Sequence, residues 1–392
     1  MDRPWLHIIG LGEDGLAGLP DASRAALAGA AAIFGGPRHL ALVGAGDRGR
    51  PWPVPFDVAP VLAHRGRPTV VLASGDPFWF GAGSSLMPYL APGEWQAHPA
   101  PSTFSLAAAR LGWRLEETTC LGLHAAPFAR LRLHLALGAR LIVLLRDAQA
   151  PAALAAWLDC AGFGTSRPHV LQALGGPQER ITETTAAGFD LTNIAAPVAV
   201  AIEAMGEGLP QTPGLPDHLF ATDGQITKSP IRALTLAALA PRKDQVLWDL
   251  GAGSGSISVE WCLAGGRAHA VERRADRAAN IRANALGFGV DHRLTLHPGA
   301  SHDLIATLPR PDAVFVGGGG DAALFKRLFE VLPPGIRLVA NGVTLETEAL
   351  LAALHASHGG TLTRIEIASA AALGTMRGWQ PARPVVQWSV TR

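Results

Sequence analysis

The segment from Val246 to Ser258 constrains the fold of this chain more than any other. An apolar run carries one acid, Asp249, and then passes into glycines at alternate positions, Gly251, Gly253 and Gly255. An apolar helical pattern follows directly. A short buried strand, a glycine turn and a helix form the first unit of an open parallel sheet. Glycines in such a turn let a ligand approach backbone that a β-carbon would block.

Glu272 stands 21 residues after Gly251, at the end of a second predicted strand. An acid there can accept hydrogen bonds from two ribose hydroxyls. A dinucleotide and S-adenosylmethionine both fit such a unit, and a tight turn without a ligand is the third alternative. Dinucleotide loops have the spacing Gly-x-Gly-x-x-Gly, because the pyrophosphate needs room at the helix start. The spacing Asp-x-Gly-x-Gly-x-Gly found here favours S-adenosylmethionine.

This loop resembles motif I of the class I S-adenosylmethionine-dependent methyltransferases. The resemblance implies that the acid and the loop hold the amino-acid end of the cofactor, and that Glu272 holds its ribose. The loop residues concerned are Asp249, Leu250, Gly251, Ala252, Gly253, Ser254 and Gly255.

The whole chain sets further limits. Its 392 residues suggest two or three domains, and a net charge of +1 implies no strong attraction to nucleic acid or to a membrane surface. Three well-separated cysteines and scattered histidines suggest neither a disulfide framework nor a metal site. An early acid and glycine turn argue against a secretory signal, and no apolar stretch is long enough to span a membrane. We therefore expect a cytoplasmic enzyme without a metal.

The N-terminal half carries three loops that follow predicted strands. The first contains Gly10 and Leu11. The acids Glu13 and Asp14 come directly after Gly12 and would repel a pyrophosphate, so we do not expect this loop to bind a nucleotide phosphate. The second, Ser74-Gly75-Asp76-Pro77, lies at the carboxyl end of a strand, where ligands bind in open α/β sheets. The third leads into a helix that Ser102 or Thr103 is expected to cap.

These loops resemble those of the tetrapyrrole (corrin and porphyrin) methyltransferases. The resemblance implies two α/β lobes that hold S-adenosylmethionine between them. The implied cofactor-binding residues are Gly10, Leu11, Gly75, Asp76, Ser102, Thr103 and Phe104.

Two further stretches look like the corrin-forming branch of that family. One is 35–40, which supplies Arg38 as a substrate-binding candidate. The other is 175–181. His124 is a second candidate, although Leu123-His124-Ala125-Ala126 departs from the Leu-His-Gly sequence, followed by a basic residue, that the branch leads us to expect.

Glycines and prolines interrupt 206–216, which we predict to be a linker between domains 1–205 and 217–392. A lead-in helix is expected to begin with Ser229 as its cap and Pro230 at the first helical position. This helix would place Thr227 and Lys228 beside the glycine turn.

The C-terminal half resembles the decarboxylating precorrin methyltransferases of cobalamin biosynthesis, through Asp223-Gly224-Gln225-Ile226-Thr227-Lys228, the glycine loop and the four glycines 317–320. The resemblance implies a Rossmann-like class I methyltransferase domain. Gly299 and Ala300 would flank the adenine, and Gly317 would lie where substrate meets the methyl group.

Both halves together imply a fusion enzyme with one S-adenosylmethionine site in each domain and no metal. The implied reaction methylates precorrin-6Y at C5 and C15, removes the C12 acetate as carbon dioxide and yields precorrin-8. Decarboxylation and C15 methylation would belong to the C-terminal domain, and C5 methylation to the N-terminal domain. Lys228 is the candidate cation for the acetate, and assembly into a homo-oligomer is expected by resemblance alone.

Two other functions stay open. A class I RNA methyltransferase with an RNA-binding domain would share the glycine loop, although the chain has no basic run. A non-enzymatic tetrapyrrole carrier could use the glycine loops only to shape a pocket. Titration with S-adenosylmethionine separates the three functions, since we expect two sites per chain for the fusion enzyme, one for the RNA enzyme and none for the carrier.

Overall fold

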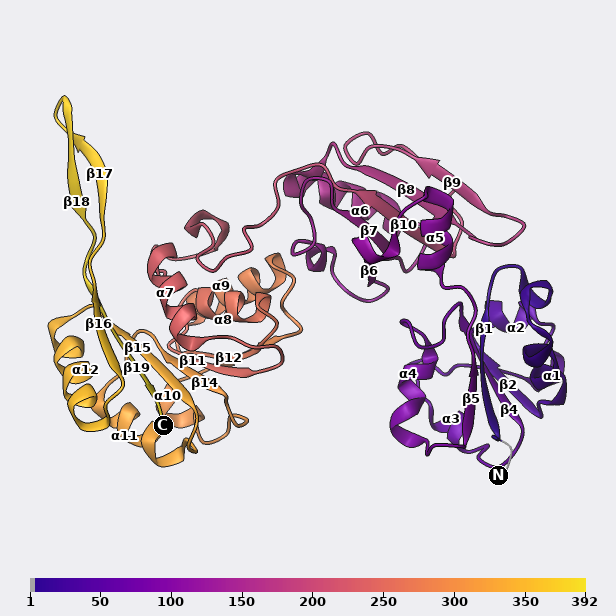
Figure 1. The fold of residues 1–392 in the computed structure, drawn as a ribbon, viewed down its shortest axis with the longest axis horizontal. Coiled ribbons are helices and arrows are strands. Elements are labelled where there is room, and N and C mark those ends of the chain that lie inside the picture. Colours follow the sequence, from indigo (N-terminus) through magenta and orange to yellow (C-terminus); the bar gives the residue numbers. More distant parts are fainter. Residues whose placement is uncertain (1–3) are drawn as a thin grey trace. The chain divides into compact units, whose positions relative to one another are not determined.

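The computed structural model describes residues 4–392, and the chain divides into two compact units (Figure 1). The first unit runs to Ala126 and continues over His134–Glu207. The second unit contains Pro127–Leu133 and Gly208–Arg392. The short segment 127–133 therefore belongs with the C-terminal unit, although it lies far from it in sequence.

The first unit begins with a five-stranded parallel sheet in the order β3-β2-β4-β1-β5. Its strands are β1 (Leu6–Leu11), β2 (Ala32–Gly35), β3 (Gly49–Pro51), β4 (Thr69–Ser74) and β5 (Trp95–His98). Its helices are α1 (Asp21–Gly29), α2 (Pro37–Leu42), α3 (Ala59–Leu62) and α4 (Ala82–Leu86). Leu27 of α1 packs on one face of the sheet, and Val61 and Leu86 of α3 and α4 pack on the other. Both faces are covered, which is why β4 is a continuous apolar run.

A second five-stranded sheet follows in the order β6-β7-β10-β8-β9, with only β6 and β7 parallel. Its strands are β6 (Thr118–Gly122), β7 (Arg140–Leu144), β8 (Arg167–Gln172), β9 (Arg180–Glu183) and β10 (Val198–Glu203). Its helices are α5 (Thr103–Leu111) and α6 (Ala150–Leu158). The Oγ of Ser102 accepts a hydrogen bond from the Ser105 amide at 3.1 Å and caps α5, which confirms the predicted cap.

The second unit is built on a seven-stranded sheet in the order β13-β12-β11-β14-β15-β19-β16. The first five of these strands are parallel, and the last two pair antiparallel. The strands are β11 (Val246–Leu250), β12 (Arg267–Glu272), β13 (Leu294–Pro298), β14 (Ala313–Val316), β15 (Arg337–Gly342), β16 (Thr361–Ile365) and β19 (Val385–Thr391).

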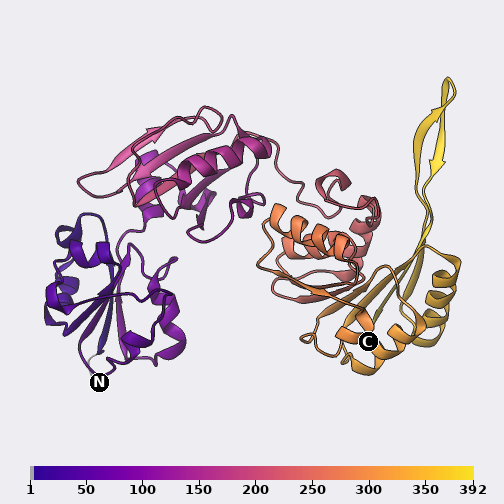
Figure 2. The ribbon, with the colours of Figure 1, turned by 180° about the vertical axis from the view of Figure 1, so that it is seen from behind.

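Helices cover both faces of this sheet (Figure 2). One face packs against α7 (Ser229–Leu239), α8 (Ser256–Leu263) and α9 (Ala275–Gly287). The other packs against α10 (Ser301–Leu304) with the residues after it, α11 (Ala322–Val331) and α12 (Leu345–His358). The two-lobed first unit and the Rossmann-like second unit confirm the predicted fold class. None of the helices in 4–392 is both long and apolar enough to span a membrane.

The start of α7 differs from the expectation. Lys228 occupies the N-cap position without a side-chain cap, and Ser229 is the first helical residue. The Ser229 hydroxyl instead donates a hydrogen bond to the carbonyl of Gly214 at 2.6 Å. The predicted Ser229 cap is therefore wrong, because a long-range contact to the preceding segment takes up the hydroxyl.

A two-stranded ribbon, β17 (Ala368–Leu373) and β18 (Met376–Pro381), extends away from the seven-stranded sheet (Figure 1). Leu373, Met376 and Trp379 on it are 70–77% exposed. An isolated hairpin is marginally stable in water. Its exposed apolar side chains thus form a surface that nothing in the described chain covers.

Candidate functional site

The glycine loop of the second unit lies against the end of β14. Gly251 has a φ of +72°, and a β-carbon on it would lie 2.2 Å from the carbonyl oxygen of Gly318. The amides of Gly251 and Ala252 both donate to the carbonyl of Val271 at 3.0 Å. Close backbone approach between neighbouring strand ends therefore requires glycine here.

Glu272 lies directly beside this loop. Its Oε2 accepts a hydrogen bond from the Gly253 amide at 2.9 Å, and its Oε1 accepts one from the Arg274 amide at 2.9 Å. A carboxylate offers about four acceptor positions. Each oxygen of Glu272 therefore keeps the capacity to accept a further hydroxyl, as the ribose role requires.

Asp249 lies beneath the loop and is 1% exposed. Its Oδ2 accepts hydrogen bonds from the amide and the hydroxyl of Ser258, at 3.2 and 2.6 Å. Its Oδ1 is buried and has no hydrogen-bond partner within the part of the chain that the structure describes. Burial raises the pKa of Asp249 to about 6, against the effect of the Ser258 hydrogen bonds. An unpaired buried acceptor fits a site that receives an ammonium group.

The other predicted residues of this site converge on the same sheet edge. The Gly299 amide donates to the Glu272 carbonyl at 3.0 Å, and Ala300 directly precedes α10. The Gly317 amide donates to the Leu250 carbonyl at 3.0 Å. This convergence follows from the topology of the sheet, because the carboxyl ends of its parallel strands all lie at the same edge.

Thr227 and Lys228 have other contacts. The carbonyl of Thr227 accepts a hydrogen bond from the buried Arg232. The Nζ of Lys228 lies 3.4 Å from an oxygen of Asp217, and the side chain is 64% exposed. The candidate cation for the acetate is therefore already paired with a carboxylate.

Asn284 on α9 is a site residue that the sequence did not reveal. It is 3% exposed, and its Nδ2 donates to the carbonyls of Ser254 and Ala221, at 2.8 and 2.9 Å. Its Oδ1 accepts from the Ala221 amide at 2.7 Å. Asn284 thus ties the segment before α7 to the glycine loop. An asparagine within a helical pattern gave no signal of this role.

In the first unit, three loops meet at the carboxyl ends of β1, β4 and β5. A β-carbon on Gly10 would lie 1.9 Å from the carbonyl oxygen of Gly75 and 2.6 Å from the amide of Ala100. The Gly75 amide donates to the Leu11 carbonyl at 3.0 Å. Asp76 accepts a hydrogen bond from the Phe78 amide at 2.8 Å and so shapes its own turn. The predicted residues of this half therefore also come together.

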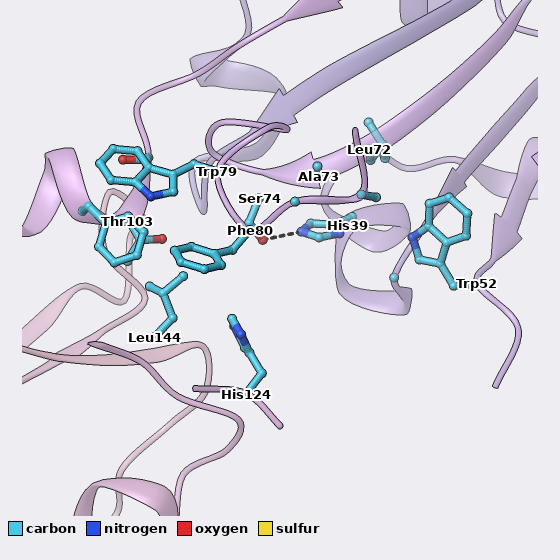
Figure 3. A pocket seen from close by; sticks show the side chains of 15 residues that line it. His39, Trp52, Leu72, Ala73, Ser74, Trp79, Phe80, Thr103, His124 and Leu144 are labelled. Carbon is cyan, nitrogen blue, oxygen red and sulfur yellow. Dashed lines mark hydrogen bonds between the residues drawn. The ribbon is translucent and has the colours of Figure 1, made fainter. Parts of the chain in front are cut away.

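A cavity of about 240 Å³ lies beside these loops (Figure 3). Ser102, Thr103 and Phe104 from the start of α5 line it, together with Trp79 and Phe80. Leu11 and Phe104 are only 1% exposed, so their side chains belong to the core. Aromatic side chains with a few polar groups are typical of small-molecule pockets.

His39, Ser74 and Arg38 form a connected group at one side of the cavity. The Nε2 of His39 lies 2.9 Å from the Ser74 hydroxyl and 2.9 Å from Nη2 of Arg38. Through its other terminal nitrogen, Nη1, Arg38 forms an ion pair with Glu13. Burial, with a smaller effect of the Arg38 charge, lowers the pKa of His39 to about 4. Because a guanidinium can only donate, Nε2 must be the acceptor nitrogen of a neutral ring.

His124 lies at the other side of the same cavity, close to Phe80 and Leu144 (Figure 3). The residue is exposed overall, and the partial burial of its ring lowers its pKa. Among residues 4–392, no hydrogen bond or ion pair to its imidazole is found. Nor does that range contain a group of three or more His, Cys, Asp or Glu side chains placed to hold a metal ion.

Both halves match known families over long stretches. Residues 6–190 match the tetrapyrrole (corrin/porphyrin) methylases, and residues 218–392 match the precorrin methyltransferase domain. Together with the two loop clusters, these matches define the protein as a methyltransferase that acts on a tetrapyrrole.

Two curated relatives extend over nearly the whole chain. The precorrin-6Y C(5,15)-methyltransferase (decarboxylating) of a Sinorhizobium species is 48% identical over 99% of this chain and 97% of its own length. The protein of the same description from Mycobacterium tuberculosis is 40% identical over 98% of this chain and 99% of its own length. The chain belongs to this family of decarboxylating precorrin-6Y C(5,15)-methyltransferases.

A solved C-terminal domain of the Rhodobacter capsulatus precorrin-6Y C5,15-methyltransferase is 59% identical, with a TM-score of 0.46. The match covers 47% of this chain and all of that domain. The family match confirms the predicted resemblance and identifies the protein as a methylating and decarboxylating enzyme of cobalamin biosynthesis. Its methyl donor is S-adenosylmethionine, as the methyltransferase family implies.

Proposed function

We propose that the protein methylates precorrin-6Y at C5 and C15 and removes its C12 acetate as carbon dioxide, giving precorrin-8, with one S-adenosylmethionine site in each domain. The predicted division into domains 1–205 and 217–392, with the linker between them, is part of this proposal. Two separate loop clusters rich in glycine carry this proposal, one around Gly10 and Gly75 and the other around Gly251. Each cluster lies at the carboxyl ends of parallel strands.

In the C-terminal domain, each residue of the site has one task. Asp249 Oδ1 receives the cofactor's ammonium group, and the loop amides and carbonyls from Leu250 to Gly255 line its amino-acid end. Glu272 accepts the ribose hydroxyls, while Gly299 and Ala300 flank the adenine. Gly317 leaves room beside the methyl group, and Thr227 borders the site from the segment before α7.

In the N-terminal domain, Gly10, Leu11, Gly75 and Asp76 offer backbone groups to the second cofactor. Ser102, Thr103 and Phe104 border it from the start of α5. The bound sulfonium supplies an electrophilic methyl group. The protein supplies alignment, which is worth up to about 7–11 kcal/mol in well-oriented reactions.

The substrate-binding candidates of the N-terminal domain are His124, which lines the cavity, and Arg38, which lies beside the cavity residue His39 and can hold a substrate carboxylate. For the acetate that leaves, Lys228 is the candidate cation of the C-terminal domain. Since Asp217 lies 3.4 Å from its Nζ, the acetate must compete with this carboxylate. The ring itself takes up the electron pair left by carbon dioxide, so the step needs no metal.

The proposal includes assembly into a homo-oligomer in the cytoplasm, without nucleic-acid or membrane partners. The exposed apolar ribbon of β17 and β18 supports assembly, because such a ribbon gains stability when its side chains are covered.

The test uses the full chain and two substitutions, Gly75→Ala and Gly251→Ala. Titration of the unmodified protein with S-adenosylmethionine should find two sites per chain, and each variant should lose one. With precorrin-6Y, Gly75→Ala should give a product that has lost carbon dioxide and carries only the C15 methyl group. Gly251→Ala should abolish carbon dioxide release. The division of labour is wrong if Gly251→Ala releases carbon dioxide at the unmodified rate.

A further inference from the structure

Methylation at C5 requires a proton acceptor. The meso carbon attacks the methyl group with an electron pair of the ring, the carbon–sulfur bond breaks, and the sulfur keeps that bond's electrons. The new carbon–carbon bond leaves C5 with both a hydrogen and a methyl group, and the ring one electron pair short. Loss of the C5 hydrogen as a proton returns its bonding pair to the ring. A base in the cavity has to accept this proton.

Most polar side chains that line the cavity are not suited to this task. Serine and threonine hydroxyls are not bases at neutral pH, and Ser102 also caps α5. The basic nitrogen of His39 already lies within hydrogen-bond distance of the Ser74 hydroxyl and the Arg38 guanidinium. Its other nitrogen is buried and carries the ring proton. A cation 2.9 Å from Nε2 also opposes protonation of His39.

His124 differs from His39 in each of these respects. It follows β6, and the Leu123 amide beside it donates to the Leu144 carbonyl at 2.9 Å, which fixes the backbone. Within the described chain its imidazole has no hydrogen-bond or ion-pair partner, and its ring is directed toward the cavity below Phe80 (Figure 3). Partial burial of the ring lowers its pKa, which favours the neutral form whose lone pair can accept a proton.

We propose that His124 is the catalytic base that accepts the C5 proton after methyl transfer in the N-terminal cavity. This inference rests on the proposed assignment of C5 methylation to that domain. On accepting the proton, the His124 side chain becomes an imidazolium. It afterwards releases the proton to solvent, so no further reactant is needed.

The test compares His124→Asn with His134→Asn in the full-length protein. His134 is a matched control because burial also lowers its pKa, yet it does not line the cavity. We expect His124→Asn to slow C5 methylation by about 100-fold, the scale of general base catalysis, in kcat rather than in KM. Carbon dioxide release and C15 methylation should continue, both cofactor sites should still titrate, and added imidazole should restore part of the C5 rate. His134→Asn should match the unmodified protein.

The inference is overturned if His124→Asn methylates C5 at the unmodified rate, or if its loss of rate is confined to KM and imidazole does not restore it. Gly75→Ala separates this failure from a failure of the proposed function. If Gly75→Ala abolishes C5 methylation while His124→Asn does not, the domain assignment stands and only the base is wrong. If neither substitution affects C5 methylation, the assignment itself is wrong.

Discussion

A β-carbon on Gly251 would lie 2.2 Å from the carbonyl oxygen of Gly318, closer than any real non-bonded contact. The two glycines belong to loops that follow adjacent strands, β11 and β14. The shape of the cofactor loop in the second unit therefore depends on backbone that lies more than sixty residues away in sequence.

Gly251→Ala should lower the free energy of unfolding by about 2–4 kcal/mol, since it combines a positive φ with a backbone clash. Gly253→Ala is the matched control, because Gly253 has a φ of +60° but nothing within 4 Å of its β-carbon position. It should cost only about 1 kcal/mol. Denaturant unfolding of both variants measures the difference. Equal losses would show that backbone conformation, and not the approach to Gly318, requires the glycine.

Arg232→Met should destabilise the second unit strongly. Arg232 is fully buried, and its guanidinium pairs with Glu260, which also accepts hydrogen bonds from the amides of Gly214 and Leu215 at 2.7 and 3.0 Å. Removing one partner of a buried pair costs about 3–5 kcal/mol, because the other charge stays buried and unpaired. Thermal unfolding measures the loss.

A paired substitution, Arg232→Met with Glu260→Gln, serves as the control for this prediction. It should recover part of the stability, because no unpaired charge is left. If the single and the paired variants unfold at the same temperature, charge pairing is not the cause of the loss.

Acid should destabilise the protein through two histidine pairs on neighbouring strands. The rings of His7 and His98 approach to 3.0 Å, and those of His269 and His297 to 2.9 Å. Burial lowers the pKa of all four rings, and the partner ring further lowers the pKa of His7 and of His269. The unfolded chain therefore binds more protons than the folded one as pH falls below about 6.5, and stability is lost there.

Denaturant unfolding at a series of pH values from 8 to 5 measures this effect. The slope of the free energy of unfolding against pH should correspond to about one proton bound on unfolding for each histidine pair. His98→Gln combined with His297→Gln should flatten the dependence. An unchanged slope in this double variant would contradict the prediction.

Asp249→Asn should change stability and cofactor binding in opposite directions: at pH 8 it should relieve the cost of a buried charge, and it should weaken cofactor binding. The pKa of Asp249 is raised to about 6, so the folded state holds a proton there more tightly than the unfolded state does. The cost of burying the charged form is consequently greatest above about pH 6, and it decreases as pH falls from there toward the ordinary carboxyl value of 3.8. The melting temperature of the variant relative to the unmodified protein should be higher at pH 8 than at pH 5.

The same substitution should weaken binding of S-adenosylmethionine to the C-terminal site by roughly 10-fold or more, since a charged acceptor is replaced by a neutral one. Calorimetric titration at pH 8 measures both sites, and the N-terminal site serves as the internal control. Unchanged affinity at both sites would show that Asp249 supports the loop without contacting the cofactor.

Much of the fold follows from local sequence. The alternating glycines after Val246–Leu250 predicted the first strand, turn and helix of the second unit. The pair Ser102 and Thr103, either of which could serve as a cap, predicted the start of α5. These features depend on residues close together in the chain, where a positive φ or a helix cap has a recognisable side-chain pattern. Family resemblance then linked the two halves to tetrapyrrole methylation.

Tertiary structure alone decided which side chains meet. Asn284 reaches Ser254, Arg232 reaches Glu260, and Ser229 bonds to Gly214 instead of capping α7. It also decided that the His39 ring contacts Arg38 and Ser74, while the His124 imidazole has no hydrogen-bond or ion-pair partner among residues 4–392. Such contacts depend on how helices and loops pack over a completed sheet, and residues distant in sequence carry no local pattern that records their partners.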